Sequence, residues 1–295
     1  IMLIEGKLDK LRFEQAFREL VDRHESFRTS FHMIDGKPVQ KVHSNVDFSV
    51  MYMETDEERA AKIASEFIRT FDLDEAPLLR VGLIKVGEDR YIMMFDKHHI
   101  ISDGVSDDIL VREFMSLYEG KELPELKIQY KDFSVWQNRL FADGTISKQE
   151  EYWLQVFKGE IPLLNMPLDY PRPAIQSFEG DVISFKAGKE LAVKLNKLAV
   201  NNGATLYMVL LASYNVLLSK YTGQEDIIVG SPVAGRPHTD LQDVIGMFVN
   251  TLAMRNHPQG GKTFVDFLNE VRENSLRAYE NQDYQFEELV DKLNL

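Results

Sequence analysis

The sequence predicts an α/β (mixed α+β) protein that is divided into two lobes. In both halves of the chain, segments with helical spacing of apolar residues alternate with short runs of β-branched and aromatic residues. The 295 residues exceed what a single hydrophobic core usually supports. A proline-rich stretch without helical or strand periodicity separates the halves. We therefore expect an N-terminal lobe over 1–160, an interlobe linker over 161–175 and a C-terminal lobe over 176–295.

Each element of the first half follows from local pattern. Apolar residues three and four positions apart predict helices, alternating patterns predict strands, and Asp35-Gly36 predicts a tight hairpin turn. Thr55 precedes a helical pattern and is expected to cap it. In chain order the expected elements are a helix over 8–24, strands over 27–33 and 38–42, a helix over 56–70, strands over 78–86 and 91–96, and helices over 104–118, 130–141 and 149–157.

The second half repeats the same mixture without a strict sequence repeat. Residues 205–220 are apolar nearly all round, which predicts a buried helix. A break at Gly246 is expected to interrupt the last strand. In chain order the expected elements are a strand over 180–185, helices over 189–201 and 205–220, strands over 226–231 and 244–255, and a helix over 264–281.

Composition excludes several classes of protein. The net charge is −13 and no Arg-rich run is present, so a nucleic-acid partner is not expected. The absence of Cys excludes disulfides, thiolate metal sites and a Cys nucleophile, and it fits a cytoplasmic protein. No apolar run is long enough for a bilayer and no signal peptide opens the chain, so no membrane partner is expected. Both ends look cut, and we expect a fragment of a longer chain.

One short stretch concentrates titratable groups. His98 and His99 follow the strand expected over 91–96, and Asp103-Gly104 opens the next helix. Side chains of adjacent strand residues point to opposite faces, so only one of the two histidines is expected to face a reactant. Asp103 allows two interpretations, a helix N-cap or a partner for a distant Arg. Neither histidine lies in a zinc-binding pattern, and no Gly-x-Ser-x-Gly elbow supports a Ser nucleophile.

Five motifs carry a resemblance to a known family. His98-His99-x-x-x-Asp103-Gly104 resembles the signature of the chloramphenicol acetyltransferase-like superfamily. Four further blocks, in the family's order, resemble motifs of nonribosomal peptide synthetase condensation domains; the last of them departs from the family pattern at Asn281 and Gln285. These four blocks are residues 23–31 (RHESFRTSF), 130–137 (YKDFSVWQ), 245–252 (IGMFVNTL) and 281–287 (NQDYQFE). The family's opening and closing motifs are absent, which again suggests truncation at both ends.

The resemblance implies a fold, an activity and partners. Members have two acetyltransferase-like lobes arranged as a V, with a tunnel for two substrates. It implies that the chain forms a peptide bond between a donor acyl or peptidyl thioester and an acceptor aminoacyl thioester. The thioesters are carried by the 4'-phosphopantetheine arms of donor and acceptor peptidyl carrier protein domains, with an adenylation domain in the same synthetase. No cofactor is expected to bind the chain directly, and no metal.

The same resemblance implies roles for individual residues. His99 lies beside the tunnel, as a general base or as a group that orients the acceptor amine, and the N–H of Gly104 is a candidate oxyanion donor. His98 and Asp103 support His99, and Asp103 is expected to pair with Arg236 and so to join the two lobes.

Six further residues have less specific expectations. Arg28 is a second supporting charge, whereas Arg23 is expected at a solvated helix end. Ser106 is a candidate for the tunnel lining, and Asn250 either lines the tunnel or makes a strand-edge hydrogen bond. Trp136, together with Phe133 of the same block, is expected in the core.

Rival functions share parts of this pattern. Epimerisation domains share the histidine motif but lack the block over 248–251, and heterocyclisation domains replace the motif itself. A coenzyme A-dependent acyltransferase lacks the condensation blocks. A non-catalytic platform for carrier or partner proteins usually has a broken histidine motif, whereas here the motif is intact.

Overall fold

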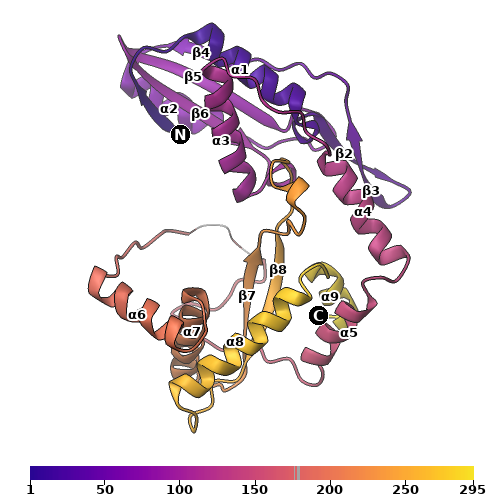
Figure 1. Cartoon of the computed structure of the whole chain (residues 1–295). Coiled ribbons are helices and arrows are strands. Elements are labelled where there is room, and N and C mark those ends of the chain that lie inside the picture. Colours follow the sequence, from indigo (N-terminus) through magenta and orange to yellow (C-terminus); the bar gives the residue numbers. More distant parts are fainter. Residues whose placement is uncertain (176, 178–179) are drawn as a thin grey trace. The chain divides into compact units, whose positions relative to one another are not determined.

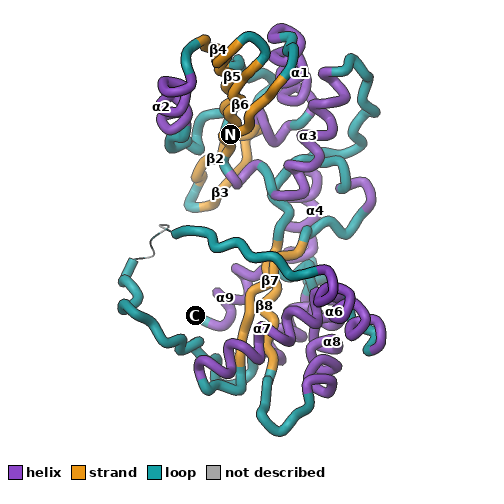
Figure 2. The backbone as a smooth tube through the Cα atoms, turned by 90° about the vertical axis from the view of Figure 1, so that its left-hand side faces the viewer, coloured by secondary structure: helices purple, strands orange, loops and turns teal. Residues whose placement is uncertain are grey.

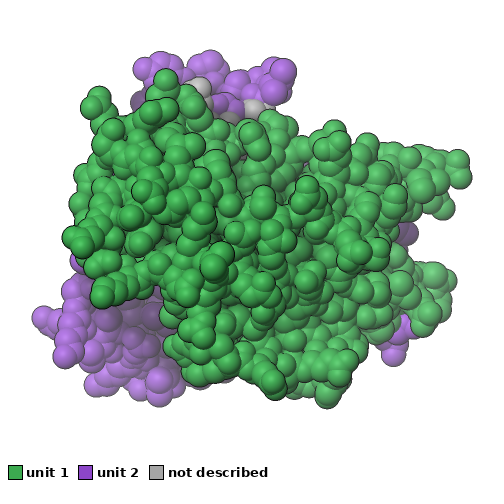
Figure 3. Space-filling model, turned by 90° about the horizontal axis from the view of Figure 1, so that it is seen from above, with its two compact units in different colours: residues 1–143, 234–249 green, residues 144–233, 250–295 purple. Residues whose placement is uncertain are grey.

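The computed structural model describes every residue except 176, 178 and 179, and it divides into two compact units. Unit 1 comprises residues 1–143 and 234–249, and unit 2 comprises residues 144–233 and 250–295 (Figure 3). The two units mix helices with strands, which confirms the predicted α/β (mixed α+β) class. The lobe boundaries expected around residues 161–175 stay a prediction. Among the described helices, none is both long and apolar enough to cross a bilayer.

A four-stranded sheet forms the centre of unit 1 (Figure 1). Its strands lie in the order β1 (Met2–Glu5), β6 (Arg90–Lys97), β5 (Leu79–Gly87) and β4 (Met51–Glu54). β4 runs parallel to β5, whereas the other pairs are antiparallel. A parallel pair needs a crossover connection, and helix α2 (Glu57–Phe67) supplies it. β4 was not predicted from the sequence, because a strand of only four residues gives little periodicity.

Helices cover both faces of this sheet. α1 (Lys10–Arg23) and α3 (Gly104–Tyr118) share one core with the sheet, in which the rings of Phe17 and Phe114 lie 4.6 Å apart. α2 packs on the sheet through the small residues Ala60 and Ala64, in a second hydrophobic cluster that is separate from the one shared by α1 and α3. This packing fixes the end of β6 and the start of α3, so it also fixes the short loop between them, residues 98–103.

A β-hairpin and a further helix complete the first 143 residues. β2 (Thr29–Ile34) pairs with β3 (Lys37–Val42), as the sequence predicted. Asp35 and Gly36 both have positive φ, 51° and 74°, the conformation that a two-residue type I′ turn requires. α4 (Tyr130–Ala142) follows, with a capping box between Gln129 and Asp132.

Unit 2 is built on a two-stranded antiparallel sheet. β7 (Ile227–Val233) pairs with β8 (Asn250–Asn256). The helices of this unit are α5 (Ser147–Val156), α6 (Lys189–Asn201), α7 (Leu206–Thr222), α8 (Phe264–Glu280) and α9 (Phe286–Leu293). The described part of the connection between α5 and α6 has neither helix nor strand (Figure 2).

Two predicted strands are wrong in part or in full. Residues 180–185 form no strand, and Ile183 and Phe185 are each 91% exposed. Their apolar pattern was the only basis for the prediction, and no described strand pairs with them. Of the strand predicted over 244–255, only Asn250–Asn256 forms. The backbone of Gly246 instead lies against the Ser106 hydroxyl, whose oxygen accepts from the Gly246 N–H at 3.1 Å and lies 3.0 Å from its C=O.

Two glycines allow the segment 234–249 to pack within unit 1. A Cβ on Gly246 would lie 2.2 Å from the ring of Tyr130, whose hydroxyl donates to the Met247 carbonyl at 2.7 Å. A Cβ on Gly235, which has a φ of +62°, would lie 1.8 Å from the Phe248 carbonyl oxygen. Both positions therefore exclude any side chain.

We expect Gly246→Ala to destabilise unit 1, because the added methyl overlaps the Tyr130 ring and forces it or the segment 234–249 to move. Overpacking of this kind costs about 1 to 3 kcal/mol. Gly261→Ala is the matched control, since a Cβ there meets no atom within 4 Å. Urea unfolding of the two variants measures the difference, and equal stabilities would contradict the packing described here.

Candidate active site

The histidine pair lies in a 3-10 turn and not in a strand. β6 ends at Lys97, and His99–Ile101 form one turn of 3-10 helix before α3 begins at Gly104. The expectation that strand alternation separates His98 from His99 is therefore wrong. The two side chains still have different roles, because His98 is the N-cap of the turn and His99 is its first residue.

His98 supports the turn. Its Nδ1 accepts from the N–H of Ile100 at 3.1 Å, and its own N–H donates to the Leu78 carbonyl at 3.0 Å. Its ring also meets the ring of Phe71 edge-on, with centroids 6.3 Å apart. These contacts hold the start of the loop against β5 and leave His98 half-buried.

His99 is exposed. Within the described part of the chain, its imidazole makes no hydrogen bond, ion pair or ring contact. Its carbonyl accepts from the N–H of Ser102 at 3.2 Å, so the backbone is held while the side chain is not. An imidazole with both nitrogens accessible can donate to or accept from a substrate.

Asp103 fulfils both interpretations that the sequence left open. It is the N-cap of α3, and its Oδ1 accepts from the N–H of Ser106 at 2.8 Å. The same oxygen accepts from the Ser106 hydroxyl at 2.7 Å and from Nη2 of Arg236 at 3.1 Å. Oδ2 accepts from the N–H of Phe248 at 3.1 Å. The carboxylate is 1% exposed and fully hydrogen-bonded.

Arg236 is the predicted partner, and the pairing is present. Its Nη1 donates to the carbonyls of Leu241 and Val244 at 2.5 and 2.6 Å, and its guanidinium lies 4.0 Å from the centre of the Phe248 ring. Both partners belong to unit 1. The ion pair thus anchors the segment 234–249 on the start of α3, inside one unit, and the expectation that it joins two lobes stays a prediction.

The surroundings favour ionised Asp103. Burial alone would raise the pKa of this carboxyl, but the hydrogen bonds from Ser106, the charge of Arg236 and the N–H of Phe248 outweigh it. The pKa of Asp103 therefore lies below its ordinary value. A buried anion with this many donors is stable only while its cationic partner remains.

Ser106 and Gly104 differ in their exposure to solvent. Ser106 is fully buried in the Asp103–Arg236 network, so the expectation that it lines a tunnel is wrong. Gly104 is exposed, and a Cβ there would meet no atom within 4 Å. It is the first residue of α3, where backbone N–H groups have no partner within the helix. Its amide is therefore placed to bind an anion.

The arginines of the first motif are structural. Arg28 donates to the carbonyls of Val21 at 3.0 Å and Asp22 at 3.1 Å, at the C-terminal end of α1, and to those of His43 and Ser44 after β3. It supports the fold near the end of α1 and, among the described residues, makes no hydrogen bond or ion pair with the histidine loop. The solvated helix end expected for Arg23 is wrong, because Arg23 pairs with Glu113 at 3.0 Å and is largely buried.

Sequence reasoning missed the buried His24. Its side chain is 0% exposed, and its Nε2 lies 2.7 Å from Oε2 of Glu113 on α3. Burial lowers the pKa of His24, opposed by the hydrogen bond and charge of Glu113. Glu113 lies three and four positions after the apolar residues Leu110 and Ile109 of the same helix, and this was the available signal, since a buried Glu needs a partner.

The expected positions of Asn250 and Trp136 can be compared with the structure. Asn250 is buried, and its Nδ2 donates to the carbonyls of Gln282 and Tyr284 at 2.8 and 2.9 Å. Its Oδ1 accepts from the N–H of Thr251 and Phe286. The side chain is thus a hydrogen-bonding scaffold at the strand end. Trp136 is 41% exposed, so its expected core position is wrong.

Phe133, of the same block, is buried as expected, against Phe248.

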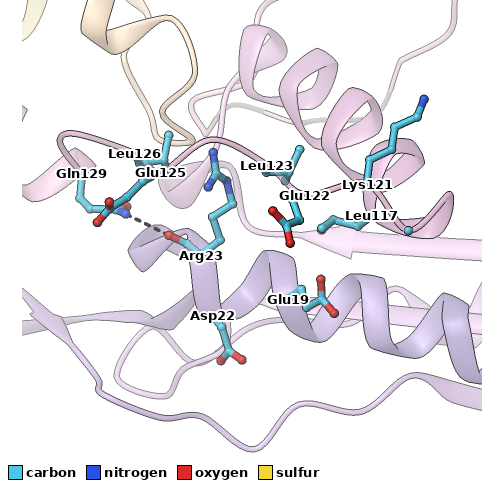
Figure 4. A pocket seen from close by; sticks show the side chains of 11 residues that line it. Glu19, Asp22, Arg23, Leu117, Lys121, Glu122, Leu123, Glu125, Leu126 and Gln129 are labelled. Carbon is cyan, nitrogen blue, oxygen red and sulfur yellow. Dashed lines mark hydrogen bonds between the residues drawn. The ribbon is translucent and has the colours of Figure 1, made fainter.

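A surface hollow lies apart from the histidine loop, although Arg23 of the first motif lines it. Its volume is about 780 Å³, and it lies between α1 and the loop after α3 (Figure 4). Leu117 and Leu123 line it together with acidic side chains, including Glu19 and Glu122. None of the predicted site residues lines this hollow. Among the described residues, no three His, Asp or Glu side chains group as metal ligands.

Comparison with known proteins identifies the class. Among solved structures, the X-domain from teicoplanin biosynthesis matches 99% of this chain and 67% of its own, with a TM-score of 0.91 and 24% identity. The condensation domain from the monacolin K polyketide synthase matches 100% of this chain and 70% of its own, with a TM-score of 0.87 and 21% identity. These likenesses establish the chloramphenicol acetyltransferase-like fold.

The chain belongs to the condensation domain family, whose sequence model matches residues 1–295. Gramicidin S synthase 2 of Aneurinibacillus migulanus is 59% identical over the whole chain, and tyrocidine synthase 3 of Brevibacillus parabrevis is 59% identical over 292 residues. The chain spans only 7% and 4% of the lengths of these two relatives.

We expect Asp103→Ala to lose about 3 to 5 kcal/mol of unfolding free energy, because it leaves the Arg236 guanidinium buried without its anion. Asp108→Ala, an exposed change on the same helix, is the control. Melting temperature and soluble yield measure the effect. A variant that folds as well as the wild type would contradict a structural role for Asp103.

We also expect unfolding free energy to fall on acidification, partly through His24. Its folded pKa lies below the ordinary 6.5, so the unfolded state binds more protons once the pH drops towards 6.5. The contribution of neutral, buried His24 to the unfolding free energy is complete above pH 6.5 and is lost as the pH falls below it.

His24→Gln should therefore show a smaller loss between about pH 7.5 and pH 5.5 than the wild type. The exposed change His238→Gln should keep the wild-type dependence. An unaltered pH dependence in His24→Gln would contradict the assignment.

Proposed function

We propose that this chain forms a peptide bond between a donor acyl or peptidyl thioester and an acceptor aminoacyl thioester. The observation that carries the proposal is the exposed, unpartnered imidazole of His99 on a turn whose two ends are anchored. Membership of the condensation domain family supports it. Epimerisation and coenzyme A-dependent acyl transfer are the alternatives within the same superfamily.

The reaction needs little base strength from the protein. The acceptor α-amine attacks the thioester carbonyl and forms a tetrahedral intermediate with an oxyanion and a protonated nitrogen. The C–S bond then breaks, and the proton from the nitrogen passes to the leaving thiolate, which gives the amide and a free thiol. A free α-amine has a pKa of about 7.7 to 8.0, so a large fraction is already neutral near pH 7.5. Bases in catalytic triads are oriented by a third group, and His99 has none among the described residues. We therefore assign His99 to orient the amine and to stabilise its developing charge.

Gly104 supplies the complementary donor. Its N–H is the first of α3, where the helix dipole favours negative charge. The open space at its Cα leaves room for a carbonyl oxygen. Asp103 already caps Ser106 from the buried side of the helix start. The oxyanion is thus proposed to bind the Gly104 amide from the exposed side.

The partners follow from this chemistry. The thioesters are proposed to arrive on the 4'-phosphopantetheine arms of donor and acceptor peptidyl carrier protein domains. An adenylation domain of the same synthetase would load the acceptor, in the cytoplasm. A solved nonribosomal peptide synthetase of four domains, bound to AMP and glycine, shares the fold at 22% identity.

A non-catalytic platform is the rival from another class. The X-domain of teicoplanin biosynthesis has this fold and was solved in complex with OxyB. The intact His98-His99-x-x-x-Asp103-Gly104 motif and the exposed His99 favour catalysis in the present chain.

We expect His99→Ala to slow dipeptide formation by about 10²- to 10³-fold, because the amine loses the group that orients it and stabilises its developing charge. The assay mixes two loaded carrier domains with the intact protein and follows the product over time. His238→Ala, at an exposed histidine, is the control. Dipeptide formation by His99→Ala at the wild-type rate would exclude the catalytic proposal.

His99→Gln separates the two roles of the imidazole. It keeps a donor and an acceptor but cannot take a proton at neutral pH. Activity well above that of His99→Ala is expected for an orienting group. Equal loss in both variants would instead indicate a general base.

A further inference from the structure

We propose that Lys97 is a positioning residue that closes the base of the loop carrying His99. Its Nζ lies 2.7 Å from the Ser102 hydroxyl and 2.5 Å from Oδ1 of Asp107. Lys97 is the last residue of β6, Ser102 follows the 3-10 turn, and Asp107 lies in the first turn of α3. One ammonium thus joins the strand, the loop and the helix.

The contact between Lys97 and Ser102 restrains the position of the 3-10 turn, which the turn's own backbone hydrogen bonds do not. Within the turn, the N–H of Ile101 donates to the His98 carbonyl at 3.3 Å, and the N–H of Ser102 donates to the His99 carbonyl at 3.2 Å. These bonds set the shape of the turn but not its place between β6 and α3. The bond from Lys97 to Ser102 connects the residue before the turn with the residue after it. His99 is therefore held from both sides.

Asp107 neutralises the charge of the Lys97 ammonium. The Lys97 side chain is only 16% exposed, so its charge needs a nearby anion. A carboxylate in the first turn of a helix is itself favoured by the helix dipole. Because Asp107 is half exposed, the ion pair should add little to global stability. Its main effect is expected on the position of the loop.

This anchor is separate from the Asp103–Arg236 pair. Asp103 fixes the start of α3 through buried bonds to Arg236 and Phe248. Lys97 binds neither of these groups in the described structure and instead ties Ser102 to the end of β6. The two anchors act on neighbouring residues, 102 and 103, from different elements. Loss of Lys97 should leave the buried pair in place.

The test has an arm that rests on the proposed function and an arm that does not. In the first, Lys97→Met in the intact protein with loaded carrier domains should lower kcat about 10-fold, since a displacement of about 1 Å can cost 10²-fold. KM for the acceptor carrier should stay within about twofold of the wild type. Asp107→Asn should reproduce the effect, and Lys97→Arg should restore most of the rate.

The second arm measures hydrogen exchange of the amides of Ile101 and Ser102, without any substrate. Lys97→Met should speed their exchange while the melting temperature changes little. Lys62→Met, which removes an exposed ion pair with Glu66 on α2, is the control and should change neither kcat nor exchange.

The outcomes distinguish the two proposals. Unchanged exchange together with unchanged kcat in Lys97→Met overturns the inference. So does a loss of kcat that Lys97→Arg fails to recover. Faster loop exchange in Lys97→Met, in a protein whose wild type forms no dipeptide, would support the positioning role and refute the proposed reaction instead.

Discussion

The buried ion pair between Asp103 and Arg236 is the interaction on which the rest of the site depends. It places a fully hydrogen-bonded carboxylate at the first turn of α3, and it binds the segment 234–249 to the same point. A pair of charges taken out of water is stabilising only when its geometry is good and most of its polar atoms are hydrogen-bonded. Asp103 accepts four hydrogen bonds, and Nη1 of Arg236 donates to two carbonyls, although Nε of Arg236 has no partner among the described residues. These bonds give the loop before α3 a fixed end.

Within unit 1, the motifs over 23–31 and 130–137 both bond the backbone of the segment 245–247, close to this pair in sequence and structure. The Ser26 hydroxyl of the first motif donates to the Ile245 carbonyl at 2.6 Å, and the Tyr130 hydroxyl donates to the Met247 carbonyl. Gly246 provides the space that the Tyr130 ring occupies. The motifs are thus mainly structural, and the exposed groups that we propose to be reactive are His99 and the amide of Gly104.

Local patterns in the sequence predicted the secondary structure of unit 1 well, because the turn at Asp35-Gly36 and the amphipathic helices are encoded by neighbouring residues. The resemblance added the Asp103–Arg236 contact, which no spacing could give across 133 positions. The strand expected over 180–185 failed because apolar residues indicate a strand only where a partner strand exists. His24 was missed because its partner, Glu113, is brought to it by the packing of α1 on α3. The 3-10 turn at His99 was missed because strand alternation was extended past Lys97.

The coupling free energy between Asp103 and Arg236 tests this account most directly. A double-mutant cycle with Asp103→Asn, Arg236→Met and the combined variant, measured by urea unfolding, gives that value. Two charges that satisfy each other in the interior should show a coupling of about 1 to 3 kcal/mol, with the double variant more stable than the sum of the single losses predicts. Strictly additive losses would show that the pair does not hold the loop, and would contradict the account.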